Sequence, residues 1–353
     1  MGRSRAVRAY TVGGVSPDQG AVLGSPPPRR WWQLRRRRPT TAFVLSGGGN
    51  KGAAQVGMLS ELVRRRIEAD FLVGSSVGGI NAAAYSADPT PAGVARLAEV
   101  WLRTKGEDIF PRGRFGGRWQ FIQKGQAVYR PDGLRRMIEE FLDFSELEDA
   151  PVPLELVASS LSDGRERWLS RGPAVEALLA TCALPGVFPP VHIEGDELID
   201  GGVLNDVPLL RALARGASRV FVLLCRPLRH APVRVERPIE AILAAFSLAI
   251  DGRFTRELEM LPGGVEVVVI GADLPRDQDF WDFSRTAEFI EAGRASAAEV
   301  LDAYLGGGRP ARLAEPWPGE EPGVSLVVRA DGARPAPRRP AHHLEAPSSP
   351  SQR

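Results

Sequence analysis

The stretch FLVGSSVGGINAAAYSA, residues 71–87, decides the fold. Phe71–Val73 is a short apolar run that predicts a buried strand, and the alanine-rich run Ile80–Ala87 predicts a helix. Between them, Gly74 and Gly78 lie two residues before and two residues after Ser76. A sharp turn from strand to helix needs small residues at these positions, and it exposes the serine hydroxyl at the end of the strand. The pattern therefore indicates a serine nucleophile, although it also occurs by chance in turns that only pack small residues.

Apolar runs and helical periodicities alternate over residues 40–305. Strands are expected at Thr41–Leu45, Phe71–Val73, Leu154–Ala158, Arg167–Leu169, Leu198–Ile199, Val220–Cys225 and Val265–Ile270. Helices are expected up to about Arg66, over 80–87, 134–142, 173–182, 206–215, 237–261 and 284–305. This order predicts an α/β domain with a mostly parallel central sheet and helices on both faces. Ligand sites in such sheets lie at the carboxyl ends of the strands.

The domain is flanked by two polar segments. Residues 1–39 form a basic, Pro/Arg-rich N-terminal arm, and residues 306–353 form a Pro/Gly/Arg-rich tail that we expect to be mostly disordered. Val324–Val328 is a candidate strand within this tail. In the arm, Arg29–Arg38 combines arginine with tryptophan, as interfacial membrane anchors do, and a solvated arm is the alternative. The run from Phe110 to Tyr129 mixes glycine, arginine and aromatic residues, which fits either a lid or a surface loop.

Composition excludes several classes of protein. The net charge of +2 over 353 residues gives no general attraction to nucleic acid. No apolar run approaches the roughly 18 residues of a membrane span, and the arm lacks the apolar stretch of a secretory signal. We therefore expect a cytoplasmic protein, with peripheral membrane contact through the arm as an open alternative.

The excess of arginine over lysine, with abundant alanine, glycine and proline, is typical of a GC-rich bacterial genome. Cys182 and Cys225 lack the spacing of a metal site.

A second motif, Gly47-Gly48-Gly49-Asn50-Lys51-Gly52, follows the first strand and opens a helix. Glycines let backbone N–H groups face an anion, and the start of the helix adds positive potential. Such a turn can hold an oxyanion or a phosphate, or it can be purely structural. Two observations count against a nucleotide: Asp70 precedes the second strand instead of ending it, and Gly52 stands where a P-loop has serine or threonine.

A third motif, Asp200-Gly201-Gly202, ends a short strand. An Asp-Gly turn is common and carries little information alone, but a serine nucleophile needs a base. The chain has four histidines, and each is more easily explained as a residue of a loop or of the tail: His192, His230, His342 and His343. We therefore expect Asp200 to act directly on Ser76.

These three motifs, in this order and spacing, resemble the patatin-like phospholipase family over about residues 40–305. The segment Thr181-Cys182-Ala183-Leu184-Pro185-Gly186-Val187-Phe188-Pro189-Pro190 is also similar to that family, in which a serine is common where Thr181 or Cys182 stands here. Many members have arginine at the position of Lys51, whose ammonium keeps the charge without the planar fork.

The resemblance implies hydrolysis of fatty-acyl esters by a Ser–Asp dyad and a glycine-loop oxyanion hole. Carried over to this chain, the catalytic residues are Ser76 and Asp200. The oxyanion donors are expected among Gly47, Gly48, Gly49 and Val77, and the supporting residues are Lys51, Gly52, Gly74, Gly78, Gly201 and Gly202. The expected substrate is a lipid ester, and the chemistry requires no metal or organic cofactor. Two competitors remain: a catalytically weak lipid-binding or regulatory protein on the same fold, and an α/β-hydrolase with a triad of Ser76, Asp200 and His230.

Overall fold

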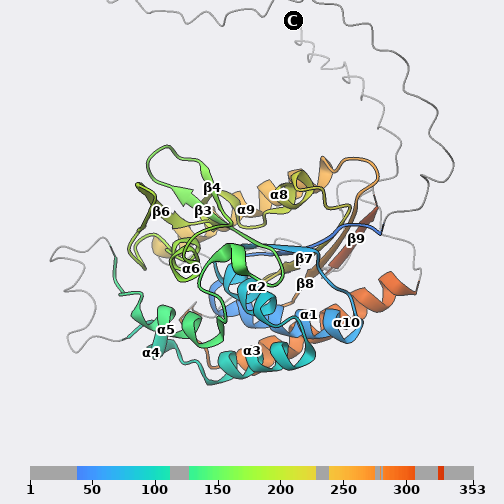
Figure 1. The fold of residues 1–353 in the computed structure, drawn as a ribbon, viewed down its shortest axis with the longest axis horizontal. Helices are drawn as coiled ribbons and strands as arrows, with labels where there is room; N and C mark the ends of the chain where they lie inside the picture. Colours follow the sequence, from blue (N-terminus) through green and yellow to red (C-terminus); the bar gives the residue numbers. More distant parts are fainter. Residues whose placement is uncertain are drawn as a thin grey trace, which may run out of the picture. The chain divides into compact units, whose positions relative to one another are not determined.

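The computed structural model describes residues 38–111, 127–227, 238–274, 279, 281–306 and 325–329. A compact unit begins at Pro39, and at its centre is a nine-stranded sheet with helices on both faces (Figure 1). The order of the strands is β5-β6-β3-β2-β1-β7-β8-β9, and β4 pairs with β3 beside this path. Their bounds are β1 Thr41–Leu45, β2 Phe71–Ser75, β3 Leu154–Ser160, β4 Glu166–Leu169, β5 Val191–Ile193, β6 Asp196–Asp200, β7 Arg219–Leu224, β8 Glu266–Gly271 and β9 Ser325–Arg329.

The five central strands, β3, β2, β1, β7 and β8, run parallel to one another. The strands at the two margins, β4, β6 and β5 on one side and β9 on the other, pair in antiparallel fashion. The predicted parallel sheet is thus confirmed at its centre, and the whole sheet is mixed. Parallel strands are covered on both faces and therefore need nearly continuous apolar sequence. The margins carry more polar strands of three to five residues, so the sequence indicates them less clearly.

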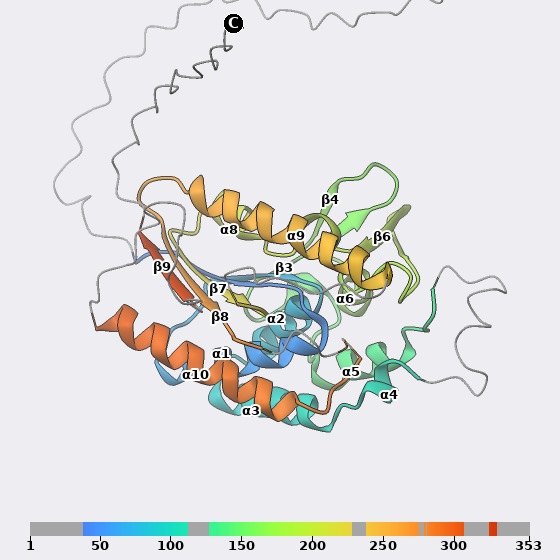
Figure 2. The same ribbon diagram turned by 180° about the vertical axis from the view of Figure 1, so that it is seen from behind.

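Two layers of helices cover the sheet (Figures 1 and 2). One face is covered by α1 Ala53–Arg64, α2 Val77–Ala87, α3 Pro91–Arg103 and α10 Thr286–Leu305, and the other by α8 Leu209–Ala214 and α9 Pro238–Glu259. Shorter elements complete the domain: α4 Gly106–Ile109, α5 Asp132–Phe141, α6 Ala174–Thr181, α7 Gly202–Asn205, and the 3₁₀ turns η2 Gly49–Gly52 and η3 Leu147–Asp149. The expected helices on both faces are confirmed.

The pleat of β1 divides the core between the two layers. Phe43 and Leu45 belong to the apolar cluster under α1, α2 and α10, whereas Ala42 and Val44 belong to the cluster under α8 and α9. Successive side chains of a strand point to opposite faces, so a fully apolar strand serves both clusters. The five residues of β1 are all buried, which places this strand and its carboxyl end at the middle of the molecule.

Two local features differ from the sequence-based expectation. The helix expected over 206–215 is present as α8, which begins only at Leu209, and the separate short helix α7 precedes the expected range. Pro208 lies between the two helices and cannot continue the hydrogen-bond pattern. The helix α3 was not anticipated, although Thr90 caps it by accepting from the Gly93 N–H and Pro91 follows at the first helical position.

The candidate strand at Val324–Val328 is β9, one residue later. The remaining flanks, residues 1–37, 307–324 and 330–353, lie outside the described residues, as do residues 112–126 of the suggested lid and His230, His342 and His343. The arm, the tail and the lid therefore stay predictions. Among the helices of the described part of the chain, none has the length and apolar character needed to cross a membrane.

Candidate active site

The turn between β2 and α2 has the sharp geometry that its sequence predicts. Ser76 caps α2 with φ 52° and ψ −128°, a backbone conformation that costs energy for a residue with a side chain. A Cβ at Gly74 would lie 2.6 Å from Gly79 Cα, and one at Gly78 would lie 2.3 Å from Leu45 O. Both positions therefore admit only glycine. Ser75 is fully buried, whereas Ser76 remains partly exposed at the end of the strand.

Ser76 and Asp200, 124 residues apart in the chain, form a direct hydrogen bond. The Ser76 hydroxyl donates to Asp200 Oδ2 over 2.7 Å. The second carboxylate oxygen, Oδ1, accepts from the Gly202 N–H over 2.7 Å, so both oxygens of the carboxylate are held. A Cβ at Gly201 would lie 2.1 Å from Val157 O, which allows this turn to lie against β3 and brings Asp200 next to β2.

Burial controls the protonation of Asp200. Desolvation is the largest influence and raises the pKa of this carboxyl to about 7, although the bonds from Ser76 and Gly202 lower it. The nearby charge of Asp206 raises the pKa further. An aspartate with a pKa near neutrality accepts a proton far better than an ordinary aspartate, so this environment makes Asp200 suited to act as a base near pH 7.

A segment that sequence reasoning did not assign to the site, Thr181–Ala183, holds both members of the pair. Thr181 Oγ1 accepts from the Ser76 backbone N–H over 2.9 Å and donates to Val157 O over 2.5 Å. Ala183 O accepts from the Asp200 N–H over 2.9 Å. The sequence signal was the similarity of this segment to the family's own, in which a serine is common where Thr181 or Cys182 stands here.

The glycine loop lies beside Ser76, and its N–H groups differ in availability. The Gly47 N–H donates to Asp206 O over 3.2 Å, which removes Gly47 from the expected oxyanion donors. Gly48 and Gly49 are exposed, and within the described residues no protein acceptor bonds to their N–H groups or to that of Val77. Gly48 has φ 155°, and a Cβ there would lie 2.3 Å from the Cys225 Cβ. The N–H groups of Gly48 and Gly49 in the loop, and of Val77 directly after Ser76, are therefore the remaining candidates for oxyanion donors.

A buried polar network fixes the two ends of the loop. Gln55 Nε2 donates to Ser46 O over 2.9 Å and to Leu223 O over 3.0 Å, which ties the start of the loop to β7. Asn81 Nδ2 donates to Gly52 O over 2.9 Å and to Gln55 Oε1 over 2.8 Å, and Asn81 Oδ1 accepts from Trp101 over 2.9 Å. Because Gln55, Asn81 and Trp101 are almost completely buried, this network restricts movement of the loop.

The remaining supporting residues have structural positions. A Cβ at Gly52 would lie 2.5 Å from Val77 Cγ2, so this glycine lets η2 approach the start of α2. Lys51 is partly exposed in η2, and its charge lowers the pKa of Cys225, although burial has the larger effect and raises that pKa to about 12. Asn50 anchors the loop from the other side, because its Nδ2 donates to Asp279 O over 3.0 Å and to Asp282 O over 2.6 Å.

Other nucleophiles and bases are poorly placed. Burial raises the pKa of the Cys182 thiol well above its usual range, and the charge of Asp200 raises it further, so this cysteine remains a neutral thiol. His192 is 71% exposed on β5 and lies 3.4 Å from Glu197. It is the only histidine among the described residues, and it is not part of the Ser76–Asp200 pair. Those residues also contain no group of three or more His, Cys, Asp or Glu side chains arranged for a metal ion.

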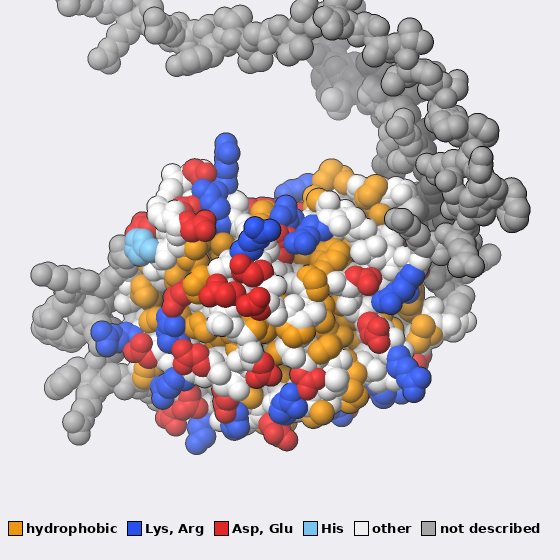
Figure 3. Space-filling view, viewed as in Figure 1, with side chains coloured by type: hydrophobic (Ala, Val, Ile, Leu, Met, Phe, Trp, Pro, Cys, Tyr) orange, Lys and Arg blue, Asp and Glu red, His pale blue; other side chains and the backbone are white. Residues whose placement is uncertain are grey.

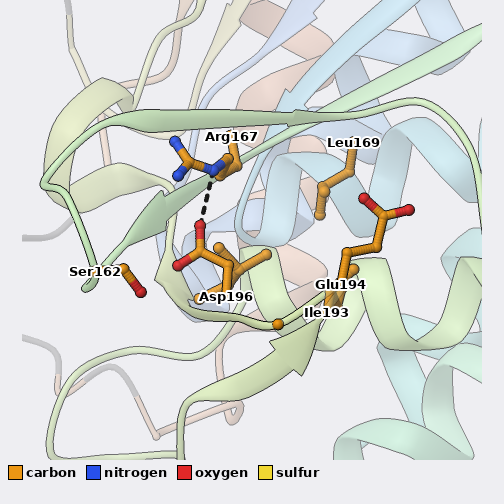
Figure 4. Close-up of a pocket in the computed structure, with 8 residues that line it drawn as sticks. Ser162, Arg167, Leu169, Ile193, Glu194 and Asp196 are labelled. Atoms are coloured by element: carbon orange, nitrogen blue, oxygen red, sulfur yellow. Dashed lines mark ion pairs between the residues drawn. The ribbon is translucent and has the colours of Figure 1, made fainter.

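Two features of the surface lie apart from the pair. A cavity of about 370 Å³ is bordered by β4, β5 and β6, and the Arg167–Asp196 ion pair of 2.7 Å lies at its wall (Figure 4). Neither Ser76 nor Asp200 lines it. On the face shown in Figure 3, acidic and basic side chains are interspersed, which is unlike the single-sign surface of a nucleic-acid-binding protein.

The comparison with known families agrees with the resemblance noted from the motifs. Residues 43–213 match the sequence profile described as patatin-like phospholipase, and this range contains the glycine loop, the Ser76 turn and Asp200. Residues 43–213 are thus similar in sequence to the patatin-like phospholipase family.

The individual relatives have low sequence identity to this chain. An uncharacterized NTE family protein of Mycobacterium tuberculosis is 26% identical over 161 residues, which cover 45% of this chain and 41% of that protein. Lysophospholipase nte1 of Aspergillus terreus is 28% identical over 176 residues, 48% of this chain and 11% of that protein. The matches thus span less than half of either relative.

Among solved structures, VipD from Legionella pneumophila aligns with a TM-score of 0.39 and 12% identity, covering 75% of this chain and 67% of that one. Human GIVD cytosolic phospholipase A2 aligns with a TM-score of 0.39 and 11% identity, covering 78% and 61%.

Proposed function

We propose that this patatin-like domain is a serine acyl hydrolase that cleaves the carboxylic ester bond of phospholipids or lysophospholipids. The observation that carries the proposal is the 2.7 Å hydrogen bond from the hydroxyl of Ser76, at its strained turn, to the buried carboxylate of Asp200. The fungal relatives named lysophospholipases support the choice of substrate class.

The proposed reaction has two steps. In the first, Asp200 takes the Ser76 proton, and Oγ forms a bond to the ester carbonyl carbon. The negative charge that develops on the carbonyl oxygen is stabilised by the N–H groups of Gly48, Gly49 and Val77, each worth about 3 kcal/mol in comparable sites. The intermediate then expels the alcohol, which leaves with the proton from Asp200, and an acyl group remains on Ser76.

In the second step, water transfers a proton to Asp200 and attacks the acyl carbonyl carbon. The new intermediate breaks its bond to Oγ, the proton returns to Ser76, and the fatty acid is released. No other proton carrier is needed, since the same carboxyl serves as base and then as acid in each half of the cycle. The pKa of Asp200 near 7 suits both tasks at neutral pH.

A fluorophosphonate probe combined with mass spectrometry tests the nucleophile. The adduct should form on Ser76 in the wild-type protein and should be absent from Ser76→Ala. The buried Ser75 and the neutral Cys182 should remain unmodified. An adduct at either of these residues, in protein that hydrolyses esters, would refute the assignment.

Assays of the wild type and its variants on a panel of substrates distinguish the proposed hydrolase from the two alternative functions. Phosphatidylcholine, lysophosphatidylcholine, triacylglycerol and short p-nitrophenyl esters should show turnover that Ser76→Ala and Asp200→Asn abolish and that His192→Ala retains. A lipid-binding or regulatory protein would bind the lipids without turnover. A several-hundred-fold loss in a folded His230→Ala variant would favour the triad with His230.

A further inference from the structure

A cavity of about 240 Å³ lies between α7 and α9. Val203 and Leu204 of α7, Val207, and Ile250 and Phe254 of α9 form its apolar walls. Pockets that enclose whole small-molecule ligands usually measure about 300–1,000 Å³. This cavity is smaller and mainly apolar, so it is suited to hold one apolar part of a larger substrate.

The cavity lies close to the proposed active site, although neither Ser76 nor Asp200 lines it. Asp206, which lines it, follows α7, and α7 follows the Asp200–Gly201 turn. A helix of four residues spans only about 6 Å, so the cavity and Asp200 are separated by a single helical turn. A Cβ at Gly47 would lie 2.3 Å from Asp206 Oδ1 and 3.3 Å from Ser76 Cβ. Asp206 and Ser76 thus both border the Cβ position of Gly47.

Of the charged side chains that line the cavity, Arg256 is exposed, and Arg253 and Asp206 are matched by partners within the protein. Arg253 Nε donates to Glu257 over 2.8 Å, its Nη2 donates to Glu166 over 2.7 Å, and its Nη1 donates to Leu204 O. Its guanidinium is therefore held by protein groups. Asp206 Oδ2 accepts from Arg226 Nη1 over 2.8 Å. With these two charges paired, apolar side chains dominate what the cavity offers to a ligand.

We infer that the cavity between α7 and α9 binds the acyl chain of the ester, with the ester group at Ser76 and the chain extending past Asp206 toward Ile250. This inference rests on the proposed function, and it adds a specificity determinant that lies partly outside the family match, since α9 begins after residue 213. The identity of residue 250 should therefore influence which acyl chains this particular chain accepts.

The test is the acyl-chain profile of Ile250 variants. Wild type, Ile250→Trp, Ile250→Ala and the matched control Leu248→Trp are assayed with p-nitrophenyl acetate, butyrate, octanoate and dodecanoate. Leu248 lies two residues away on α9, is 53% exposed and does not line the cavity. Ile250→Trp should lower kcat/KM for octanoate by about tenfold or more, which is the usual effect of a mismatch in an apolar pocket, and should leave acetate nearly unchanged.

Ile250→Ala should shift the preference toward longer chains, and Leu248→Trp should match the wild type. An unchanged octanoate-to-acetate ratio in Ile250→Trp, or an equal loss on all chain lengths, would overturn the acyl-site assignment while leaving the dyad intact. If the wild type hydrolyses no ester, the proposed function fails instead. Binding of the fluorescent fatty acid dansylaminoundecanoic acid then decides the cavity separately: weaker binding by Ile250→Trp than by Leu248→Trp supports it, and equal binding refutes it.

Discussion

At the scale of single residues, the site depends on a carboxyl group whose ionisation is made unfavourable by burial. Asp200 is 4% exposed, and its pKa of about 7 reflects desolvation that two hydrogen bonds only partly offset. The protonation of this one group therefore affects both the proposed chemistry and the stability of the fold. Higher pH favours the chemistry, and lower pH favours the stability.

The rate of ester hydrolysis should increase as pH rises through about 7. The reason is that Asp200 must be ionised to accept the proton of Ser76, and its pKa is raised to about 7 by burial. The measurement is kcat/KM for a short p-nitrophenyl ester between pH 5 and pH 9, corrected for spontaneous hydrolysis. A profile that is already flat from pH 5 upward would show that no group with this pKa limits the reaction.

Stability should depend on pH in the reverse direction. Because the pKa of Asp200 is higher in the folded than in the unfolded state, its contribution to stability is complete below pH 3.8 and is lost as pH rises to about 7. The lost free energy of unfolding is up to about 4 kcal/mol. Urea unfolding at pH 5 and pH 8 should show more than half of this loss in the wild type and much less of it in Asp200→Asn. Ser76→Ala keeps the carboxylate and should retain the loss, whereas identical behaviour of both variants would contradict the assignment.

At the scale of elements, the end of α6 connects the two strands that carry the pair. Thr181 bonds to the Ser76 N–H and to β3, and Ala183 bonds to Asp200 at the end of β6. The motifs predicted that Ser76 and Asp200 would meet. They did not predict this connection, because a lone threonine 105 residues from Ser76 has no periodicity or spacing that marks it.

Thr181 should act as a positioning residue. Thr181→Val leaves the Ser76 N–H without its partner, and an unsatisfied buried group costs about 1–3 kcal/mol, so we expect kcat to fall by roughly 10- to 100-fold. Thr181→Ser keeps the hydroxyl and should restore most of the rate. The rates of fluorophosphonate labelling of the two variants, at matched thermal stability, provide the measurement. Equal labelling would assign Thr181 a packing role only.

Sequence reasoning predicted the elements that are marked by a local apolar pattern. It did not predict contacts between residues that are far apart in the chain. All five central strands were predicted, because strands buried on both faces must be apolar along their length. The short marginal strand β5 was not, since none of its three residues is fully buried. Similarly, the glycine loop was identified from its composition, but the engagement of the Gly47 N–H by Asp206 depends on a fold that brings residues 47 and 206 together.

At the scale of the whole molecule, the compact unit begins at Pro39, and the arginine- and tryptophan-rich arm precedes it. If the arm binds anionic lipid, each arginine near the surface contributes about 1 kcal/mol, and salt weakens the effect. Deletion of residues 1–38 should then reduce cosedimentation with phosphatidylglycerol vesicles and leave the turnover of a soluble short-chain ester unchanged. Unchanged vesicle binding would identify a solvated arm, and equal loss of both would indicate that the arm supports folding.

The pairing of β9 with β8 has a consequence for shortened versions of the chain. The composition of residues 306–353 suggests a dispensable tail, yet Ser325–Arg329 covers the backbone of β8 along Glu266–Ile270. A protein that ends after Gly306 would present this valine-rich strand with unpaired N–H and C=O groups, which is the usual starting point for edge-to-edge aggregation. We expect such a truncation to form soluble aggregates in size-exclusion chromatography, whereas one that ends after Arg329 should remain unaggregated. The strand β9, in the apparent tail, would then prevent the edge of one sheet from pairing with the sheet of another molecule.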